Sequence, residues 1–139
     1  TALTAAWRDH GRISHFEGGK CTKCGTVQFP SGRLCVNPQC NAQDSQQPFS
    51  LADEAAHVLS HTSDYLAYTP HPPFQFGHID FESGARVLME FTDTDQEELH
   101  SSLSVRMVYR IKEFDAKRGF RRYFWKATHV RSISIEQGK

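Results

Sequence analysis

The chain has 139 residues, which is enough for one ordinary domain, or for a small domain with an appended module, and too few for two catalytic domains. Its 38% of hydrophobic residues and its mean hydropathy of -0.56 are typical of a globular protein, and no window approaches the roughly 18 consecutive apolar residues of a membrane-spanning helix. Sixteen Lys and Arg residues balance sixteen Asp and Glu residues, which excludes the overall basic excess of proteins that bind nucleic acid mainly through phosphate attraction.

The charge is unevenly distributed along the chain. Residues 1–50 carry five basic and three acidic side chains, residues 51–104 carry one and ten, and residues 105–139 carry ten and three. Because an acidic middle cancels a basic C-terminal part, neutrality is compatible with a local anion site near the last strands. The first residues contain no long apolar core of a signal peptide, and we expect a cytoplasmic protein with no membrane association.

The N-terminal segment, residues 1–17, predicts a short helix that runs from residue 1 to about residue 10, with Gly11 placed to stop it. Leu3, Ala6 and Trp7 share one face of this helix. A helix this short is rarely stable without tertiary contacts. We therefore expect Trp7 to dock onto the rest of the chain or onto a partner.

A cysteine-rich segment follows, and residues 18–50 together predict a small zinc ribbon and a linker. Residues 18–41 contain all four cysteines among Gly, Pro and Lys, with little material for a core. Residues 42–50 (AQDSQQPFS) predict a polar linker.

The remaining residues, 51–139, have the pattern of strands. Residues 55–63 alternate weakly, a proline cluster interrupts the chain, and residues 74–91 predict a hairpin with Ser83-Gly84 as its turn. An acidic loop (TDTDQEE) then precedes two long strand candidates, LSVRMVYRIKEF and FRRYFWKATHV, joined by the turn DAKRG. On the first of them, one face is expected to contain Val105, Met107, Tyr109 and Ile111, and the other Arg106, Arg110 and Lys112. About five strands with hairpin connections predict a mainly β fold, with a small antiparallel barrel of the OB type after the helix and ribbon.

The four cysteines fall in two close pairs, Cys21-x2-Cys24 and Cys35-x4-Cys40, separated by ten residues. Two such pairs can surround one tetrahedral Zn(II) through thiolate bonds of about 2.3 Å, as in zinc ribbons. Gly25 lets the backbone turn so that its amides face sulfur. The alternatives are two disulfides, which a reducing compartment disfavours, and a redox Cys-x-x-Cys, which normally opens a helix in a βαβ unit. We predict structural zinc, with iron as the alternative metal in a purified sample.

A four-cysteine site has no open coordination position, so its metal stabilises the fold and is not a Lewis acid. The sequence contains no fifth cysteine, and it therefore offers no free thiol as a nucleophile. We also find no triad, nucleophile elbow or carboxylate pair of a stand-alone hydrolase in the sequence. No residue is assigned a catalytic role.

The order of these motifs resembles that of a known family. The N-terminal helix is followed by Phe16-Glu17-Gly18 leading into Cys-x-x-Cys-Gly, then by Phe29-Pro30, by Arg33 before the third cysteine, and by a strand-rich barrel. Over nearly the whole chain this order is similar to that of the OB-fold acyl-CoA-associated family with a rubredoxin-like zinc ribbon. The second cysteine pair of that family is usually Cys-Pro-x-Cys, and the pair in this chain is two residues longer.

Members of that family are commonly small subunits beside thiolase-like proteins, in the cleavage or formation of carbon–carbon bonds of acyl-CoA compounds. The small subunit of benzoylsuccinyl-CoA thiolase and the partners of steroid side-chain aldolases are the examples this chain looks most like. The resemblance implies an accessory subunit, not catalytic alone, of a hetero-oligomeric thiolase-type complex in acyl-CoA metabolism such as aromatic degradation, which helps to assemble the complex and to bind coenzyme A. A partner of a retro-aldolase acting on an acyl-CoA is the alternative.

Two groups of residues are candidates for contact with coenzyme A or with the partner. The first is the basic cluster around the last predicted hairpin, Lys117, Arg118, Arg121 and Arg122. Guanidinium groups suit bidentate contact with its phosphates, although a solvated hairpin tip has the same composition. The second group, Phe74 and Phe76, follows a proline-rich stretch and suits an interface or the lining of a pantetheine site. Both phenylalanines are equally compatible with a place in the core.

Two further patterns carry weaker hypotheses. A single-strand nucleic-acid binder is the alternative from another functional class, with bases stacking on the aromatic and basic residues Phe120, Arg121, Arg122, Tyr123, Phe124, Trp125 and Lys126. The acidic middle of the chain opposes it. Glu54, His57 and His61 have the spacing of a helical metal motif, but we expect a strand there, on which residues four apart lie about 13 Å from one another.

Overall fold

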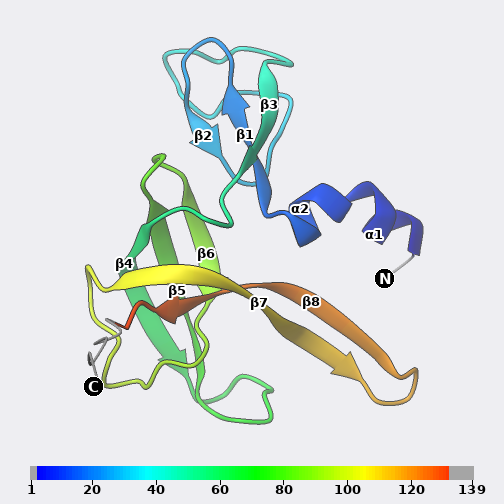
Figure 1. Ribbon diagram of the computed structural model, residues 1–139, viewed down its shortest axis with the longest axis vertical. Helices are drawn as coiled ribbons and strands as arrows, with labels where there is room; N and C mark the ends of the chain where they lie inside the picture. Colours follow the sequence, from blue (N-terminus) through cyan, green and yellow to red (C-terminus); the bar gives the residue numbers. More distant parts are fainter. Residues whose placement is uncertain (1–2, 132–139) are drawn as a thin grey trace, which may run out of the picture.

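The computed structural model describes residues 3–131 and contains two antiparallel sheets and two short helices in that part of the chain (Figure 1). The helices are α1 (Leu3–Arg8) and α2 (His10–Ser14). The first sheet consists of β1 (Glu17–Cys21), β2 (Val27–Gln28) and β3 (Gln46–Ser50). The second consists of β4 (Ala56–Asp64), β5 (Phe74–Phe81), β6 (Arg86–Glu90), β7 (Ser104–Asp115) and β8 (Phe120–His129). The fold is mainly β, as predicted, and no helix among the described residues is long and apolar enough to span a membrane.

Helix α2 continues through Gly11, so the predicted stop at this residue was wrong. The amide of Ile13 donates to the carbonyl of Asp9 at 2.9 Å, and the amide of His15 donates to that of Gly11 at 3.0 Å. The chain leaves the helical conformation at Phe16, whose φ of 50° lies in the left-handed region. A helical glycine costs about 1 kcal/mol relative to alanine, and burial of Phe16 in the core offsets this cost.

Trp7 does not dock onto the described part of the chain. Its side chain is 72% exposed and stacks on the ring of His10 at 4.8 Å between centroids. Helix α1 has no buried residue at all. The expectation that Trp7 docks within the chain was therefore wrong, and docking onto a partner stays a prediction.

The predicted linker contains a strand. β3 pairs with the whole of β1, from Glu17 opposite Ser50 to Cys21 opposite Gln46, so the linker prediction was wrong for Gln46–Ser50. The physical reason is that a three-stranded ribbon sheet is too small to bury both faces. A polar segment can still form a strand in such a sheet, because its backbone groups need partners whatever its side chains are.

The second sheet has the strand order β6-β5-β4-β7-β8. The predicted hairpin between β5 and β6 is confirmed, with Gly84 in its turn at a φ of 96°. After β6, Phe91 bridges Ala127 of β8 in parallel, and the amide of Thr92 donates to the carbonyl of Ala127 at 2.9 Å. This contact brings the two ends of the sheet together, which closes the five strands into the OB-type barrel that the sequence predicted.

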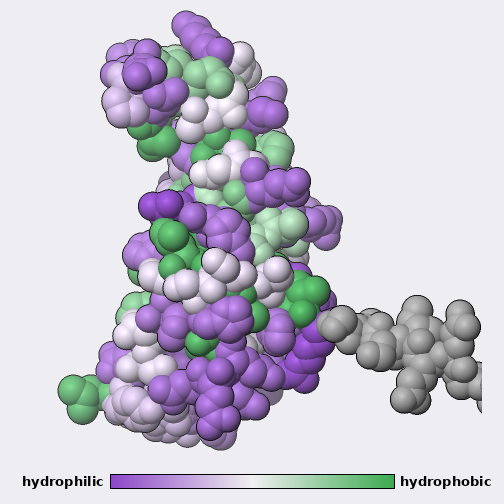
Figure 2. All heavy atoms as spheres, turned by 90° about the vertical axis from the view of Figure 1, so that its left-hand side faces the viewer, coloured by the Kyte–Doolittle hydropathy of each residue, from purple (hydrophilic) through white to green (hydrophobic). Residues whose placement is uncertain are grey.

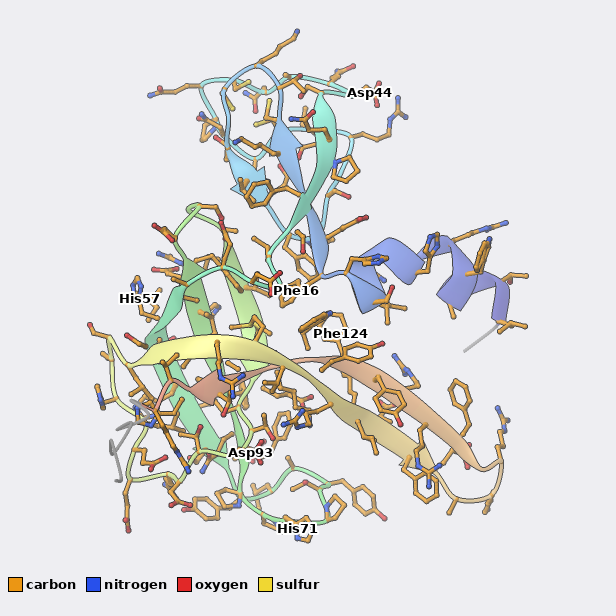
Figure 3. All side chains as sticks on the ribbon, viewed as in Figure 1. Phe16, Asp44, His57, His71, Asp93 and Phe124 are labelled. Carbon is orange, nitrogen blue, oxygen red and sulfur yellow. The ribbon has the colours of Figure 1, made fainter. Side chains whose placement is uncertain are left out.

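Phe16 lies where the ribbon, the helices and the barrel meet (Figure 3). It is fully buried, and its ring lies 4.9 Å from that of Phe29, 5.8 Å from that of Phe81 and 5.9 Å from that of Phe124. The amide of Leu51 also donates to its carbonyl at 3.0 Å. The three segments predicted from the sequence, 1–17, 18–50 and 51–139, therefore share core contacts around one side chain.

The outer parts of β7 and β8 extend beyond the barrel as a two-stranded ribbon, residues 109–125, which we call the arm (Figure 1). β7 pairs with β4 only at Ser104 and Val105, whereas it pairs with β8 from Val105 to its end at Asp115. The predicted apolar face of β7 is buried at Val105 and Met107. Tyr109 and Ile111 share that face but are 39% and 44% exposed, because the barrel no longer covers them.

Candidate metal centre and binding grooves

The four cysteines converge on one point of the ribbon, as the spacing predicted. All four sulfur atoms lie within 4.8 Å of one another, with 3.9 Å between the sulfurs of Cys21 and Cys40 and 3.5 Å between those of Cys24 and Cys35. Thiolates on a tetrahedral zinc, with bonds of about 2.3 Å, lie about 3.8 Å apart. The cluster therefore fits a structural zinc ion held by four thiolates.

Two tight turns bring the cysteines together. In the first, the amide of Gly25 donates to the carbonyl of Cys21 at 2.9 Å, and Gly25 has a φ of 77°, which an L-residue rarely adopts. In the second, the amide of Cys40 donates to the carbonyl of Asn37 at 3.0 Å, and Asn41 has a φ of 47°. The two additional residues between Cys35 and Cys40 are thus absorbed in a turn, and the cluster still closes.

Two hydroxyl groups lie beside the cluster. The Ser45 hydroxyl lies 3.1 Å from the sulfur of Cys21, and its hydrogen bond, together with those of the Cys24 and Lys23 backbone, lowers the pKa of this thiol to about 6. The Thr26 hydroxyl lies 3.2 Å from the sulfur of Cys24 and lowers its pKa as well. At Cys21 and Cys24, donors of this kind favour the thiolate form that a metal requires and hold these two ligands in place. With four sulfur ligands the site is closed, so its chemistry is structural.

The basic cluster lies on the arm, where its members differ in their partners. Arg122 pairs with Glu113 at 2.9 Å and Arg118 with Asp115 at 3.7 Å. Arg121 instead lies over the ring of Phe114 at 4.9 Å. Lys117 is in the turn at the tip of the arm, where its backbone amide donates to the side chain of Asp115 at 3.0 Å.

A groove of about 570 Å³ separates the N-terminal helices from the arm, and we call it the helix–arm groove. One wall contains Leu3, Ala6 and Ile13 of the helices, and the other contains Tyr109, Arg121 and Tyr123 of the arm, with Phe29 and Phe124 among its further lining residues. Arg122 also lines it, whereas Arg118 lines a separate hollow at the tip. The helices and the arm, whose residues line the groove, lie on the right in Figure 1, opposite to the mostly hydrophilic face that Figure 2 shows.

Phe74 and Phe76 line a second, smaller cavity of about 280 Å³, which we call the phenylalanine pocket. Their rings lie 5.4 Å apart, and both side chains are half-buried. Trp125 forms part of the lining, and the ion pair of Glu90 and Lys126, 3.1 Å long, lies at its edge. The two phenylalanines predicted as ligand contacts therefore face a cavity and are not fully buried in the core.

Lys112 is a candidate binding residue that sequence analysis missed. It lines both the helix–arm groove and the phenylalanine pocket, and its Nζ lies 5.4 Å from the centre of the ring of Phe124. The β7–β8 register shifts between Ile111 and Glu113, so Lys112 sits at an irregularity in the strand. A β-bulge redirects side chains relative to simple alternation, and alternation was the signal that placed Lys112 on the outer face.

The remaining motifs are explained by the barrel itself. Among residues 3–131, the four cysteines are the one group of His, Cys, Asp and Glu side chains close enough to hold a metal ion. His57 lies on strand β4, as predicted, and its Nε2 lies 3.9 Å from a carboxylate oxygen of Asp80. Trp125, proposed for base stacking, donates its indole N–H to the carbonyl of Ile13 at 2.9 Å, and Phe124 packs beside Phe16. These contacts engage two of the aromatic side chains on which bases of a single-stranded nucleic acid were expected to stack.

Comparison with known proteins gives consistent matches. Residues 8–44 match the model of the ChsH2 rubredoxin-like zinc ribbon domain. A DUF35 domain-containing scaffold protein of Pyrococcus furiosus is 30% identical over 116 residues, which are 78% of this chain and 79% of that protein. A DUF35 domain-containing scaffold protein of Methanocaldococcus jannaschii is 27% identical over 127 residues, covering 89% of this chain and 88% of the relative.

Solved structures have the same fold. A chain of the Ltp2-ChsH2(DUF35) aldolase superposes with a TM-score of 0.68 at 16% identity, over 91% of this chain and 93% of that one. A DUF35 protein of unknown function from Sulfolobus solfataricus superposes with a TM-score of 0.54 at 17% identity, over 93% of this chain and 87% of that one. The ribbon, the barrel and their connection are therefore a recurring arrangement.

Proposed function

The chain belongs to the DUF35 family and has that family's N-terminal zinc ribbon, and we therefore propose that it is a non-catalytic scaffold subunit of a heteromeric acyl-CoA enzyme. In this role it assembles with a catalytic partner and contributes part of the surface that binds coenzyme A. The partner supplies the nucleophile and carries out the cleavage or formation of a carbon–carbon bond. We keep a cytoplasmic location as part of the proposal.

The commitment of every cysteine to one cluster is the observation that carries this proposal. The sequence has four cysteines, and all four belong to the group whose sulfurs lie within 4.8 Å of one another. Thiolase-type chemistry needs a cysteine nucleophile and a second Cys or His for the acid–base steps. A metal that is already bound by four thiolates offers no position for a substrate. The nucleophile must therefore come from another chain.

The nature of the partner is the finer part of the proposal. We propose a thiolase-like subunit, on the resemblance of the motif order to that of thiolase small subunits. An aldolase subunit is the second candidate, and the fold match to a chain of the Ltp2-ChsH2(DUF35) aldolase favours it. The name of the archaeal relatives, scaffold protein, supports the assembly role in both cases.

The proposed contacts of the chain with coenzyme A or the partner are Phe74, Phe76, Lys117, Arg118, Arg121 and Arg122. Arg121 and Arg122 line the helix–arm groove, which supports an approach of phosphates there. Lys117 and Arg118 lie at the tip of the arm, which supports contact with a partner surface. Phe74 and Phe76 line an apolar pocket that suits a pantetheine chain.

Co-purification tests the assembly role. The tagged chain is expressed with an untagged candidate thiolase in one preparation and with an untagged candidate aldolase in another, and each captured complex is weighed by native mass spectrometry. We expect one candidate to be retained at a fixed ratio, and its identity decides between the two partner types. Retention of neither candidate, with the chain eluting alone, contradicts the proposal.

A further inference from the structure

Two cations of the helix–arm groove have no carboxylate partner among residues 3–131. The Nζ of Lys112 lies 5.4 Å from the ring centre of Phe124, and the guanidinium of Arg121 lies 4.9 Å from that of Phe114. The ion pairs of the described residues include neither cation. Both cations thus rest on aromatic faces, and within the described residues their hydrogen-bond donors have no carboxylate acceptor.

The other two cations of the groove are compensated. Arg12 pairs with Asp9 at 2.8 Å, and Arg122 pairs with Glu113 at 2.9 Å. The positive excess of the groove therefore comes from two side chains, which sit beside the exposed rings of the arm. Tyr109 and Tyr123, stacked at 5.6 Å, belong to the same wall. A ligand that combines phosphates with a flat ring is complementary to such a wall, because phosphates pair with the cations and a ring packs on the aromatic faces.

The phenylalanine pocket is adjacent to the helix–arm groove. Lys112 and Phe124 line both cavities. Of the described cations that line either cavity, Lys112 alone lines both. The pocket holds about 280 Å³ and the groove about 570 Å³, and cofactor sites commonly measure about 300 to 1,000 Å³. One extended ligand can therefore span the junction.

We propose that the helix–arm groove and the phenylalanine pocket form one binding trough for an extended phosphorylated ligand, with Lys112 at the junction as its central anion-binding residue. The inference rests on the proposed function, because it takes coenzyme A as the ligand, and it adds an orientation. The nucleotide end lies in the groove beside Arg121. The pantetheine arm crosses Lys112 and enters the pocket of Phe74 and Phe76.

Titration calorimetry on the zinc-loaded full chain tests the trough with three probes: coenzyme A, 3',5'-ADP and 4'-phosphopantetheine. Lys112→Gln is expected to weaken the binding of all three probes by roughly 10-fold or more. Each probe places a phosphate at the junction, and this phosphate loses a charge-assisted hydrogen bond to Lys112. Arg121→Gln is expected to weaken 3',5'-ADP and coenzyme A only. Phe74→Ala is expected to weaken 4'-phosphopantetheine and coenzyme A only.

Matched variants control the experiment. Arg106→Gln removes one exposed positive charge from the same strand, outside both cavities, and is expected to leave all three affinities unchanged. Lys112→Arg keeps the charge and is expected to restore binding. Melting temperatures verify that each variant is folded.

Three results overturn the inference. One is equal binding of coenzyme A by Lys112→Gln and Arg106→Gln. Another is that Arg121→Gln and Phe74→Ala each weaken the binding of 3',5'-ADP and of 4'-phosphopantetheine to the same extent, which excludes the proposed orientation. The third is absence of binding of all three probes by the parent chain. The scaffold role is decided separately by co-purification, so the trough can fail while that role stands.

Discussion

Asp80 is paired with Arg86 on the outer face of the barrel. It accepts two hydrogen bonds from Arg86, at 2.7 and 3.3 Å, and His57 lies 3.9 Å away. The Arg86 guanidinium, followed by the charges of His57 and His78, holds the pKa of Asp80 below its ordinary value although partial burial opposes the shift. The lowered pKa therefore gives Asp80 a contribution to the pH dependence of stability.

Replacement of Asp80 by Asn tests this link. A carboxylate with a lowered pKa contributes stability that is fully present above its unfolded value, about 3.9, and is lost as pH falls through the folded value. The parent should be more stable than Asp80→Asn at pH 7, by up to about 1 kcal/mol for a surface pair, and this difference should vanish in acid. Urea unfolding of both proteins at several pH values measures this difference in the free energy of unfolding. Acid also releases the metal, but it does so from both proteins, so metal loss does not contribute to the difference.

Asp93→Asn is the matched control, since Asp93 pairs with Arg110 at 3.4 Å and is 63% exposed. Asn also tolerates the φ of 53° at this position. We expect a smaller effect at neutral pH than for Asp80. A lowered pKa of Asp80 is contradicted if the difference in unfolding free energy between the parent and Asp80→Asn stays constant from pH 7 into acid.

The zinc ribbon is the element whose stability depends on metal, since the binding free energy of a structural zinc is also folding free energy. Cys24→Ser removes one of four sulfur ligands, so we expect loss of bound zinc and loss of amide protection in β1, β2 and β3. Ser45→Ala keeps all four ligands and removes only the hydroxyl beside Cys21. It is expected to retain the metal and to weaken affinity by about 10- to 100-fold, as for other groups that orient ligands.

Elemental analysis and hydrogen exchange measure the two effects. The parent should contain one zinc per chain, and the Cys24→Ser protein should contain none while β4 to β8 remain protected. The structural zinc site is ruled out if the freshly purified parent protein contains no metal and its thiols react fully under native conditions.

The elements that the amino-acid sequence predicted best are those whose pattern lies within a short stretch of residues. Cysteine spacing located the metal cluster, and alternation with a Ser83-Gly84 turn located the hairpin of β5 and β6. The errors arose where a distant contact overrides local preference. Helix α2 passes Gly11 because Phe16 is anchored in the core, and β3 forms in a polar segment because β1 supplies its backbone partners. The position of Lys112 depends on a β-bulge, which leaves no mark in the pattern of hydrophobic residues.

In the whole molecule, the proposed ligand surface is built from all three segments of the chain. The helices form one wall of the helix–arm groove, Phe29 and Pro30 of the ribbon contribute to it, and the arm forms the other wall. The indole of Trp125 holds the helix end through the carbonyl of Ile13 at 2.9 Å. The metal cluster thus acts on the groove indirectly, because it stabilises the ribbon that places Phe29. This arrangement explains how a closed metal site and a binding surface belong to one scaffold.

Reconstituted activity is the measurement that tests the scaffold role most directly. The chain alone, the co-purified partner alone and the complex of both are each given a 3-oxoacyl-CoA together with free coenzyme A for thiolysis, or a β-hydroxyacyl-CoA for aldol cleavage. We expect no turnover by the chain alone, because it has no free thiol nucleophile for thiolysis and no residue with an assigned role in aldol cleavage, and we expect a higher rate for the complex than for the partner alone. Turnover that follows the isolated chain through successive purification steps would contradict the scaffold role.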